Sequence, residues 1–286
     1  MRDASDRSSQ TFFPSPQPSP PAGERELVSR RALLQLLVAP PPREHLTALE
    51  TALARAGGLP AVHPGQTVLL KVNTNSADPA PYSTSPVVVA AVAAHYVERG
   101  VRVLVGDRSF WGDPDTRGNL ERNGIAPAAR RAGAEVVTFE DGEVEWTELP
   151  PARLPTWVPP VRVPSLVFSA AAVINLACAK THFITGVTLG LKNALGFVHA
   201  DDRRREGNLR THVRERIHAQ YREVHAALPI TFTIIDAFLA LTSGGPTPSS
   251  GDAPTIVKTG RVLASRDAHA VEAEARALLR AHGVPC

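Results

Sequence analysis

Short apolar runs alternate with helical segments along this 286-residue chain, and this alternation constrains the fold more than any other feature. The runs at 67–72, 101–106 and 134–139 are rich in Val, as strands buried on both faces of a sheet are. Segments with helical spacing lie between them at 85–99 and 119–132. Strand–helix–strand order is typical of a parallel sheet with helices on both faces. We therefore expect an α/β fold with a mostly parallel, doubly wound sheet.

Further elements are expected on both sides of this region. A first helix is expected at 44–56, and a proline- and acid-rich stretch at 141–165 favours irregular structure. The remaining expected elements are a strand at 171–175, a helix near 186–197, a basic helix at 210–227, a strand at 229–236, a hairpin-like pair at 255–265 that turns at Thr259 and Gly260, and a helix at 267–282. Together they form one expected α/β domain over residues 44–286.

Residues 1–43 differ in composition from the rest of the chain. Five prolines lie within residues 14–21, in a run also rich in Ser and Gln, and such a segment cannot bury enough apolar area to fold. Arg30 and Arg31 then precede a short apolar run that ends at Ala39. This run resembles a twin-arginine export signal without a clear A-x-A cleavage site. We expect a disordered extension and a cytoplasmic location, with twin-arginine export as the alternative.

Cysteine content and charge exclude several classes of protein. The two cysteines, Cys178 and Cys286, are too few for an in-chain cysteine-ligated iron–sulfur cluster or a zinc knuckle. No run reaches the roughly 20 apolar residues of a membrane-spanning helix. A net charge of +3 is weak evidence for a nucleic-acid partner, and glutamates interrupt the arginine-rich run 203–223, as on solvated helix faces. We expect a soluble protein with no membrane span and no nucleic-acid partner.

The segment 175–196 breaks the apolar pattern and carries most of the functional signal. The preceding strand leads into Lys180 and His182, and a glycine-spaced helix is expected to follow. Such an order presents side chains to a ligand at the carboxyl edge of an α/β sheet. Lys180 and His182 are expected to face this crevice while Cys178 points into the core. Because side chains alternate along a strand, that arrangement requires a turn or bulge at residue 179 or 180.

Other polar side chains follow the ends of the expected strands and should meet at the same crevice. Lysine and amide side chains there favour an anionic ligand, either a carboxylate or a phosphate. The N-terminus of the helix expected near 186–197 would add backbone N–H groups. The candidate substrate-binding residues are Lys71, Asn73, Lys180, Lys192 and Asn193.

Carboxylate and imidazole side chains add candidates for proton transfer or for binding a divalent metal. Asp107, His182, His212 and Asp236 are of the residue types that do both. They are scattered along the sequence, and neither an HExxH nor a DxDxDG motif accompanies them, so only the fold could bring them together. We treat these four as candidate catalytic residues; the sequence allows a divalent metal and identifies none.

In their order and spacing, these motifs resemble the family known as domain of unknown function 362, over about residues 65–274. The resemblance is carried by Leu70-Lys71-Val72-Asn73, Thr84-Ser85-Pro86, Gly106-Asp107, Asn175-Leu176 through Lys180-Thr181-His182, Leu191-Lys192-Asn193 with Gly196, His212, Ile235-Asp236, Gly245-Pro246 and Asp267. It implies an uncharacterised protein whose relatives often carry a ferredoxin-like domain with two four-iron clusters. This chain lacks the cluster-binding cysteines, which argues against a redox role, and has Glu272 where relatives usually have aspartate.

Two functions remain open on this evidence. The first is an enzyme acting on a small carboxylated or phosphorylated substrate, with lysines holding the anion and His182 or Asp107 moving a proton. The alternative is a non-catalytic binding or accessory protein that partners a separate iron–sulfur redox protein. Hydrogen-bond contact between Asp107 and His182 across one pocket would favour the enzyme, whereas a flat crevice with scattered lysines would favour binding.

Overall fold

The computed structural model describes residues 43–109, 115–208, 214–250 and 253–286, so His212 lies outside the described residues. Within them, seven strands form one main sheet in the order β3-β2-β1-β6-β8-β9, and β7 pairs with the end of β6. These strands are β1 (Thr67–Lys71), β2 (Arg102–Asp107), β3 (Glu135–Thr138), β6 (Ala172–His182), β7 (Gly186–Thr188), β8 (Ile230–Ser243) and β9 (Thr255–Ser265).

Strands β1, β2, β3, β6 and β8 run parallel to one another in this sheet. Strand β9 pairs antiparallel with β8 at one edge, and β7 pairs antiparallel with the end of β6. The chain therefore has the mostly parallel α/β fold that the alternating sequence pattern predicts. The strands that carry Lys71, Asp107, Lys180 and Asp236 all belong to this one sheet, as expected.

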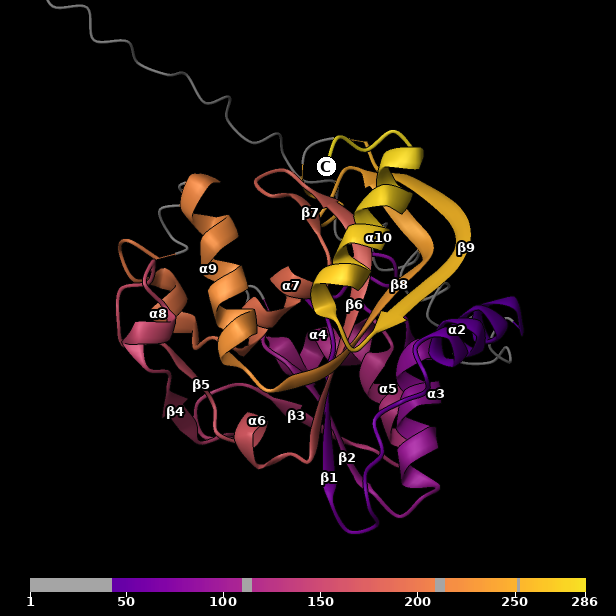
Figure 1. The fold of residues 1–286 in the computed structure, drawn as a ribbon, viewed down its shortest axis with the longest axis horizontal. Helices are drawn as coiled ribbons and strands as arrows, with labels where there is room; N and C mark the ends of the chain where they lie inside the picture. The colour runs from indigo at the N-terminus through magenta and orange to yellow at the C-terminus, as the bar shows by residue number, and fades with distance from the viewer. Residues whose placement is uncertain (1–42, 110–114, 209–213, 251–252) are drawn as a thin grey trace, which may run out of the picture.

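The main sheet lies between two layers (Figure 1), and alternate strand residues pack against one layer or the other. Leu70 and Ile174 face a layer built from α2 (Arg43–Arg55), α3 (Pro86–Val97), α4 (Thr116–Arg122) and α5 (Ile125–Arg131). Leu69 and Val173 face a layer that includes α6 (Leu166–Ser169), α7 (Gly190–Asn193), α9 (Arg214–Ala227) and a small sheet of β4 (Trp146–Glu148) and β5 (Arg162–Pro164). Helix α10 (Ala268–Ala281) packs against β8 and β9. None of the described helices is long and apolar enough to cross a membrane.

Local sequence signals determine where several helices begin and end. In the helix expected at 85–99, Ser85 Oγ accepts a hydrogen bond from the Val87 N–H at 3.2 Å, and Pro86 takes the first helical position of α3. The single helix expected at 119–132 is wrong, because α4 and α5 are separate helices. Gly124 lies between them with a φ of 87°, a left-handed conformation that ends one helix before the next begins.

The segment around residue 180 differs most from expectation. Strand β6 does not end at residue 175 but continues to His182, because β7 folds back and pairs with its last three residues. The single helix expected near 186–197 is therefore β7, then α7, then a 3-10 turn at Ala194–Phe197. The stretch at 141–165, expected to be irregular, carries β4 and β5.

The hairpin expected at 255–265 is also wrong, because β9 is one continuous strand. Strand β8 continues past Asp236 and provides a long antiparallel partner for it. Gly260, with a φ of 68°, lies where the register shifts between Ala237 and Leu239 of β8. The glycine therefore allows a β-bulge rather than a turn.

Candidate functional site

Polar side chains surround a cavity of about 90 Å³ at the carboxyl edge of the sheet. This volume is enough for several water molecules or a small ligand. Six residues predicted from the sequence line it: Lys71, Asn73, Asp107, His182, Lys192 and Asn193. Asn75, Arg108, Thr188, Leu195, Gly196, Arg203 and Ile217 complete the lining. The ends of parallel strands therefore meet at one site, as the sequence predicts.

An ion pair between Lys71 and Asp107 forms part of the cavity wall. Lys71 Nζ lies 2.6 Å from Asp107 Oδ1, and both side chains are buried. Asp107 also accepts hydrogen bonds from the backbone N–H groups of Thr74 and Arg108, each at 2.7 Å. Burial lowers the pKa of Lys71 and raises the pKa of Asp107, and the ion pair opposes both shifts. Gly196 packs directly against this ion pair, because a Cβ there would lie 2.3 Å from Asp107 Oδ1 and 2.5 Å from Lys71 Nζ and would force the pair to shift.

A chain of asparagine side chains connects β1, β6 and α7 beside this ion pair. Asn73 Nδ2 donates to Asn193 Oδ1 at 2.9 Å, and Asn193 Nδ2 donates to Asn175 Oδ1 at 2.7 Å. Asn175 Nδ2 donates to the Gly190 carbonyl at 2.8 Å. All three amides are buried, and each is held at both ends. The network fixes the position of α7, and therefore of Lys192, against the sheet.

Lys180 supports the cavity wall from behind and is not among the residues that line it. Its fully buried Nζ donates to Asn73 Oδ1 at 2.8 Å and to the Tyr82 carbonyl. Cys178 Sγ lies 3.6 Å from the same Asn73 oxygen, so Cys178 and Lys180 point to the same side of β6. The expected separation of these two side chains is therefore wrong. A register shift against β8 does occur between them, but their alternation along β6 is kept.

Lys192 lines the cavity with few partners for its amine. Its Nζ donates to Thr188 Oγ1 at 3.3 Å, and among the described residues no carboxylate pairs with it. The Lys192 side chain is half-buried, and Lys180 is nearby. Burial, with a smaller contribution from the charge of Lys180, lowers the pKa of Lys192 to about 7. A fraction of its amine is therefore neutral at physiological pH.

Two arginines that sequence reasoning missed add positive charge to the cavity. Arg108 follows β2 directly, and its Nε forms a 2.8 Å ion pair with Glu140. Arg203, from α8 (Ala200–Arg204), is 5% exposed, and its Nε has no hydrogen-bond partner within the described part of the chain. Burial and the charge of Arg108 lower the pKa of Arg203 to about 10. The position of Arg108 after a strand could have revealed it, whereas Arg203 lies in a basic run that reads as a solvated helix.

The candidate catalytic residues do not form one cluster. His182 lines the cavity, and its Nδ1 accepts a hydrogen bond from the Ile184 N–H at 3.1 Å. Asp107 is bonded to Lys71 and to two backbone N–H groups, and the Asp107–His182 hydrogen bond that would favour an enzyme is not formed. Asp236 lies elsewhere, 3.0 Å from His45 Nε2 on α2. His212 is outside the described residues. Among those that are described, no three His, Cys, Asp or Glu side chains are arranged to hold a metal ion.

Glu272 anchors the segment that carries Lys192 and Asn193. Its Oε2 accepts a hydrogen bond from the Leu191 N–H in the first turn of α7 at 3.1 Å, and its Oε1 pairs with Arg276. Burial raises the pKa of Glu272. Glu272, which stands where relatives usually have aspartate, therefore supports the structure of the cavity.

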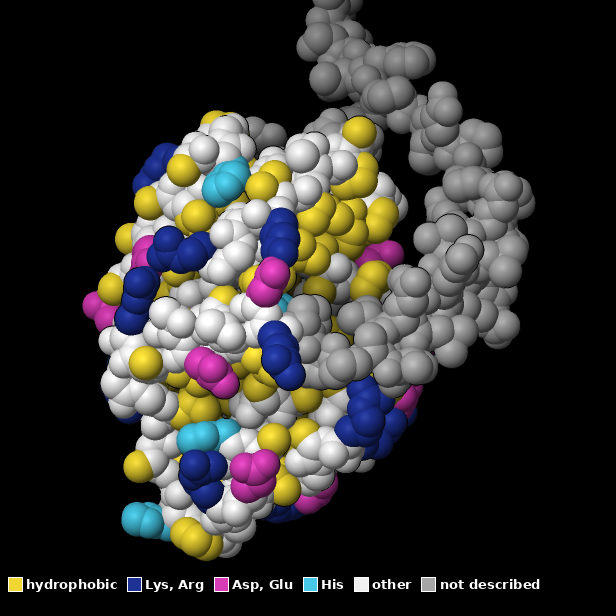
Figure 2. All heavy atoms as spheres, turned by 90° about the vertical axis from the view of Figure 1, so that its right-hand side faces the viewer, with side chains coloured by type: hydrophobic (Ala, Val, Ile, Leu, Met, Phe, Trp, Pro, Cys, Tyr) yellow, Lys and Arg dark blue, Asp and Glu magenta, His cyan; other side chains and the backbone are white. Residues whose placement is uncertain are grey.

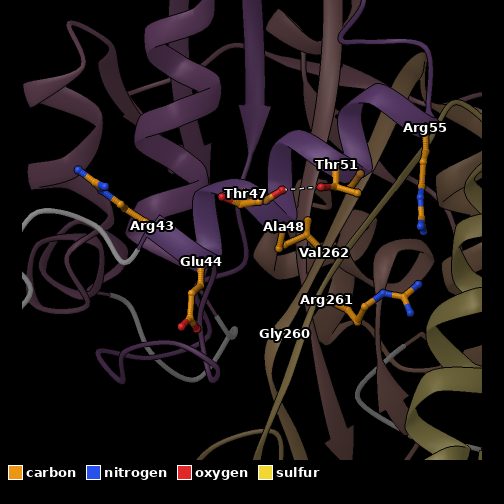
Figure 3. A pocket seen from close by; sticks show the side chains of 10 residues that line it. Arg43, Glu44, Thr47, Ala48, Thr51, Arg55, Gly260, Arg261 and Val262 are labelled. Carbon is orange, nitrogen blue, oxygen red and sulfur yellow. Dashed lines mark hydrogen bonds between the residues drawn. The ribbon is translucent and has the colours of Figure 1, made fainter.

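A larger, open hollow of about 560 Å³ lies between α2 and β9 (Figure 3). Arg43 points away from Arg55 and Arg261 in this view, so the basic side chains do not converge on one point. Two of the lining residues form exposed ion pairs: Arg261 with Glu274, and Glu44 with Lys258. Basic and acidic side chains are interspersed over the described surface on this side of the molecule (Figure 2). The smaller cavity, with its buried and convergent charges, is therefore the better candidate site.

Comparison with known proteins gives two matches. The model of the family described as domain of unknown function (DUF362) matches residues 68–276. The chain is 33% identical over 156 residues to the thylakoid-associated protein sll1697 of Synechocystis sp. (strain ATCC 27184 / PCC 6803 / Kazusa), a match covering 54% of this chain and 46% of that protein. The chain thus spans about half the length of this curated relative. No solved structure matches the chain at a significant level.

Proposed function

This chain belongs to the DUF362 family, and we propose that it is an enzyme acting on a small carboxylated or phosphorylated substrate in the cavity at the carboxyl edge of its sheet. The observation that carries this proposal is Arg203. Arg203 lines the cavity, and its buried Nε has no hydrogen-bond partner among the described residues. Leaving a buried N–H donor unbonded costs roughly 1–3 kcal/mol, and more for a charged group. An anionic oxygen bound in the cavity would remove this cost.

The charge of the lining supports the same ligand. Asp107 compensates Lys71, and Glu140 compensates Arg108. Among the described residues, no carboxylate forms an ion pair with Lys192 or Arg203. A carboxylate or phosphate would supply the missing negative charge, and guanidinium groups bind both through charge-assisted hydrogen bonds.

Of the two residues first expected to move a proton, His182 keeps this role in the proposal and Lys192 takes the place of Asp107. Asp107 is held by Lys71 and two backbone N–H groups, so it is better suited to positioning that lysine than to moving protons. His182 lines the cavity, and the pKa of Lys192 is lowered to about 7. A group with a pKa near the working pH is an efficient general acid or base. His182 and Lys192 are therefore the proposed proton-transfer residues.

Binding is tested by thermal unfolding of the full chain with phosphate, sulfate, acetate and lactate at constant ionic strength. A bound anion should raise the melting temperature, since a ligand at 100 times its Kd stabilises the folded state by about 2.7 kcal/mol. Arg203→Gln should lose this response. The control Arg117→Gln removes an exposed arginine paired with Glu143 and should keep it. Absence of any stabilisation of the wild type would refute the anion site.

Catalysis is tested separately from binding. The full chain is incubated with a mixture of small carboxylated and phosphorylated metabolites, and the mixture is followed by mass spectrometry. The wild type should deplete at least one compound, and Arg203→Gln should not. Anion stabilisation without depletion of any compound would instead favour a non-catalytic binding protein.

A further inference from the structure

We propose that Lys192 is a nucleophilic amine that forms a Schiff base with the carbonyl group of a small 2-oxo acid bound in the cavity. This inference rests on the proposed function, because the carboxylate of the oxo acid would be the anion that the cavity binds. It adds the substrate class and a covalent step, neither of which follows from anion binding alone.

The distribution of lysines in the chain is the first observation. Of 31 Lys and Arg residues, only four are lysines: Lys71, Lys180, Lys192 and Lys258. Three of them lie at or directly behind one cavity, and the fourth forms an exposed ion pair with Glu44. Arginine supplies nearly every other positive charge, but it does not deprotonate in proteins. Lysine is therefore concentrated at the cavity, where its amine can lose a proton and an arginine guanidinium cannot.

The contacts of the three site lysines distinguish one of them. The Nζ of Lys71 lies 2.6 Å from Asp107 Oδ1, and that of Lys180 is bonded to Asn73 and the Tyr82 carbonyl. Lys192 lines the cavity, and within the described ranges its Nζ has one hydrogen bond, to Thr188 Oγ1 at 3.3 Å. Its lone pair is the least engaged of the three and the best placed to reach a ligand.

The electrostatic environment supports the nucleophilic role. Burial and the nearby charge of Lys180 lower the pKa of Lys192 to about 7, so much of the amine is unprotonated near neutral pH. A desolvated lysine beside a second cationic group is a recognised way to activate an amine for Schiff-base chemistry. The asparagine network and Glu272 hold α7 in place, so the amine is presented from a fixed position.

The reaction balances without an oxidant or a metal. The carboxylate of the oxo acid binds Arg203, and the Lys192 Nζ lone pair attacks the adjacent carbonyl carbon. The C=O electron pair moves to oxygen, which takes a proton and gives a carbinolamine. The nitrogen lone pair then forms the C=N bond as the C–O bond breaks, and the oxygen leaves as water with the two protons that the amine began with. His182, on the cavity wall, is placed to pass these protons.

Reductive trapping tests the covalent step directly. The full chain is incubated with pyruvate and sodium cyanoborohydride, digested and mapped by mass spectrometry. We expect one reduced pyruvyl adduct, on Lys192, with exposed Lys258 unmodified. Lys258→Arg should be trapped as the wild type is, whereas Lys192→Arg and Lys192→Met should not be trapped. Lactate, which has the same carboxylate but no carbonyl, should slow trapping by competition.

The outcomes separate this inference from the anion-binding proposal. Stabilisation by lactate without a pyruvate adduct would overturn the Schiff base and leave the anion site standing. Equal modification of Lys258 and Lys192 would show only general amine reactivity and would also overturn it. Each Lys192 variant is also checked for stabilisation by lactate. If a variant still binds lactate but is not trapped, the loss of trapping is due to the missing amine and not to misfolding.

Discussion

Lys180 Nζ donates to Asn73 Oδ1 at 2.8 Å, so a buried lysine holds the amide that joins β1 to α7. The lysine that the sequence marks as a ligand contact is therefore part of the support of the cavity. Its role is to fix Asn73, which in turn fixes Asn193.

Removing this support should destabilise the protein. Lys180→Ala leaves Asn73 Oδ1 and the Tyr82 carbonyl without their donor and empties a buried volume, so we expect a loss of about 2 kcal/mol in the free energy of unfolding. Lys258→Ala, at an exposed ion pair, should change it by less than about 0.5 kcal/mol. Urea unfolding of both variants checks this, and equal stabilities would contradict the supporting role of Lys180.

A methyl group at position 196 should disturb the Lys71–Asp107 ion pair. A Cβ there would lie 2.3 Å from Asp107 Oδ1, so Gly196→Ala must displace the pair, and we expect a loss of about 3 kcal/mol. Gly142→Ala is the control, since no atom lies within 4 Å of its added Cβ. Its φ of 83° still makes the substitution cost about 1 kcal/mol. Thermal unfolding should therefore show the larger shift for Gly196→Ala.

Lys192 should make the stability of the ligand-free protein increase with pH. Its pKa falls from 10.5 to about 7 on folding, so between these values the unfolded chain binds a proton that the folded chain lacks. Stability then rises with pH across this window, by on the order of 3 kcal/mol. Lys192→Met removes the group, so the free energy of unfolding of the wild type should rise relative to that of the variant from pH 7 to pH 10. A constant difference would refute the lowered pKa.

His225 should contribute to unfolding in mild acid. Burial lowers its pKa from 6.5 to about 4, and its Nε2 has no hydrogen-bond partner in the described ranges. As pH falls from 6.5 to 4, the unfolded chain takes up a proton that the folded chain resists, so stability is lost in this window. His225→Phe should unfold at lower pH than the wild type. Circular dichroism during acid titration measures the difference, with exposed His282→Phe expected to titrate as the wild type does.

Sequence reasoning found the parallel strands and most of the cavity because both depend on local signals. Val-rich runs and the Ser85-Pro86 helix start identify elements directly, and polar residues after strand ends identify the crevice. The extension of β6 through Lys180 was missed, because polar residues become strand residues only when β7 folds back against them. The pairing of β7 with β6 cannot be predicted from the residues of either strand alone.

Asp236, which was predicted for the site but lies outside it, and Arg203, which lines it, show why the rest was not predictable. Asp236 lies at the end of the strand expected from the sequence. In the structure β8 continues beyond it, and its carboxylate is hydrogen-bonded to His45 of α2. Arg203 shows no strand-end signal, and it reaches the cavity from α8 through tertiary packing alone. Both outcomes depend on contacts between segments that are distant in sequence.

The Leu191–Glu272 hydrogen bond, which spans 81 positions, sets an order of assembly for the site. The asparagines and cations that surround the cavity are all present once residue 203 has been synthesised. The segment that presents Lys192 still lacks its anchor until α10 has emerged from the ribosome and folded. A nascent chain released before that point would carry nearly all the polar residues that line the cavity, with Lys192 on a segment held by the asparagine network but not yet by Glu272.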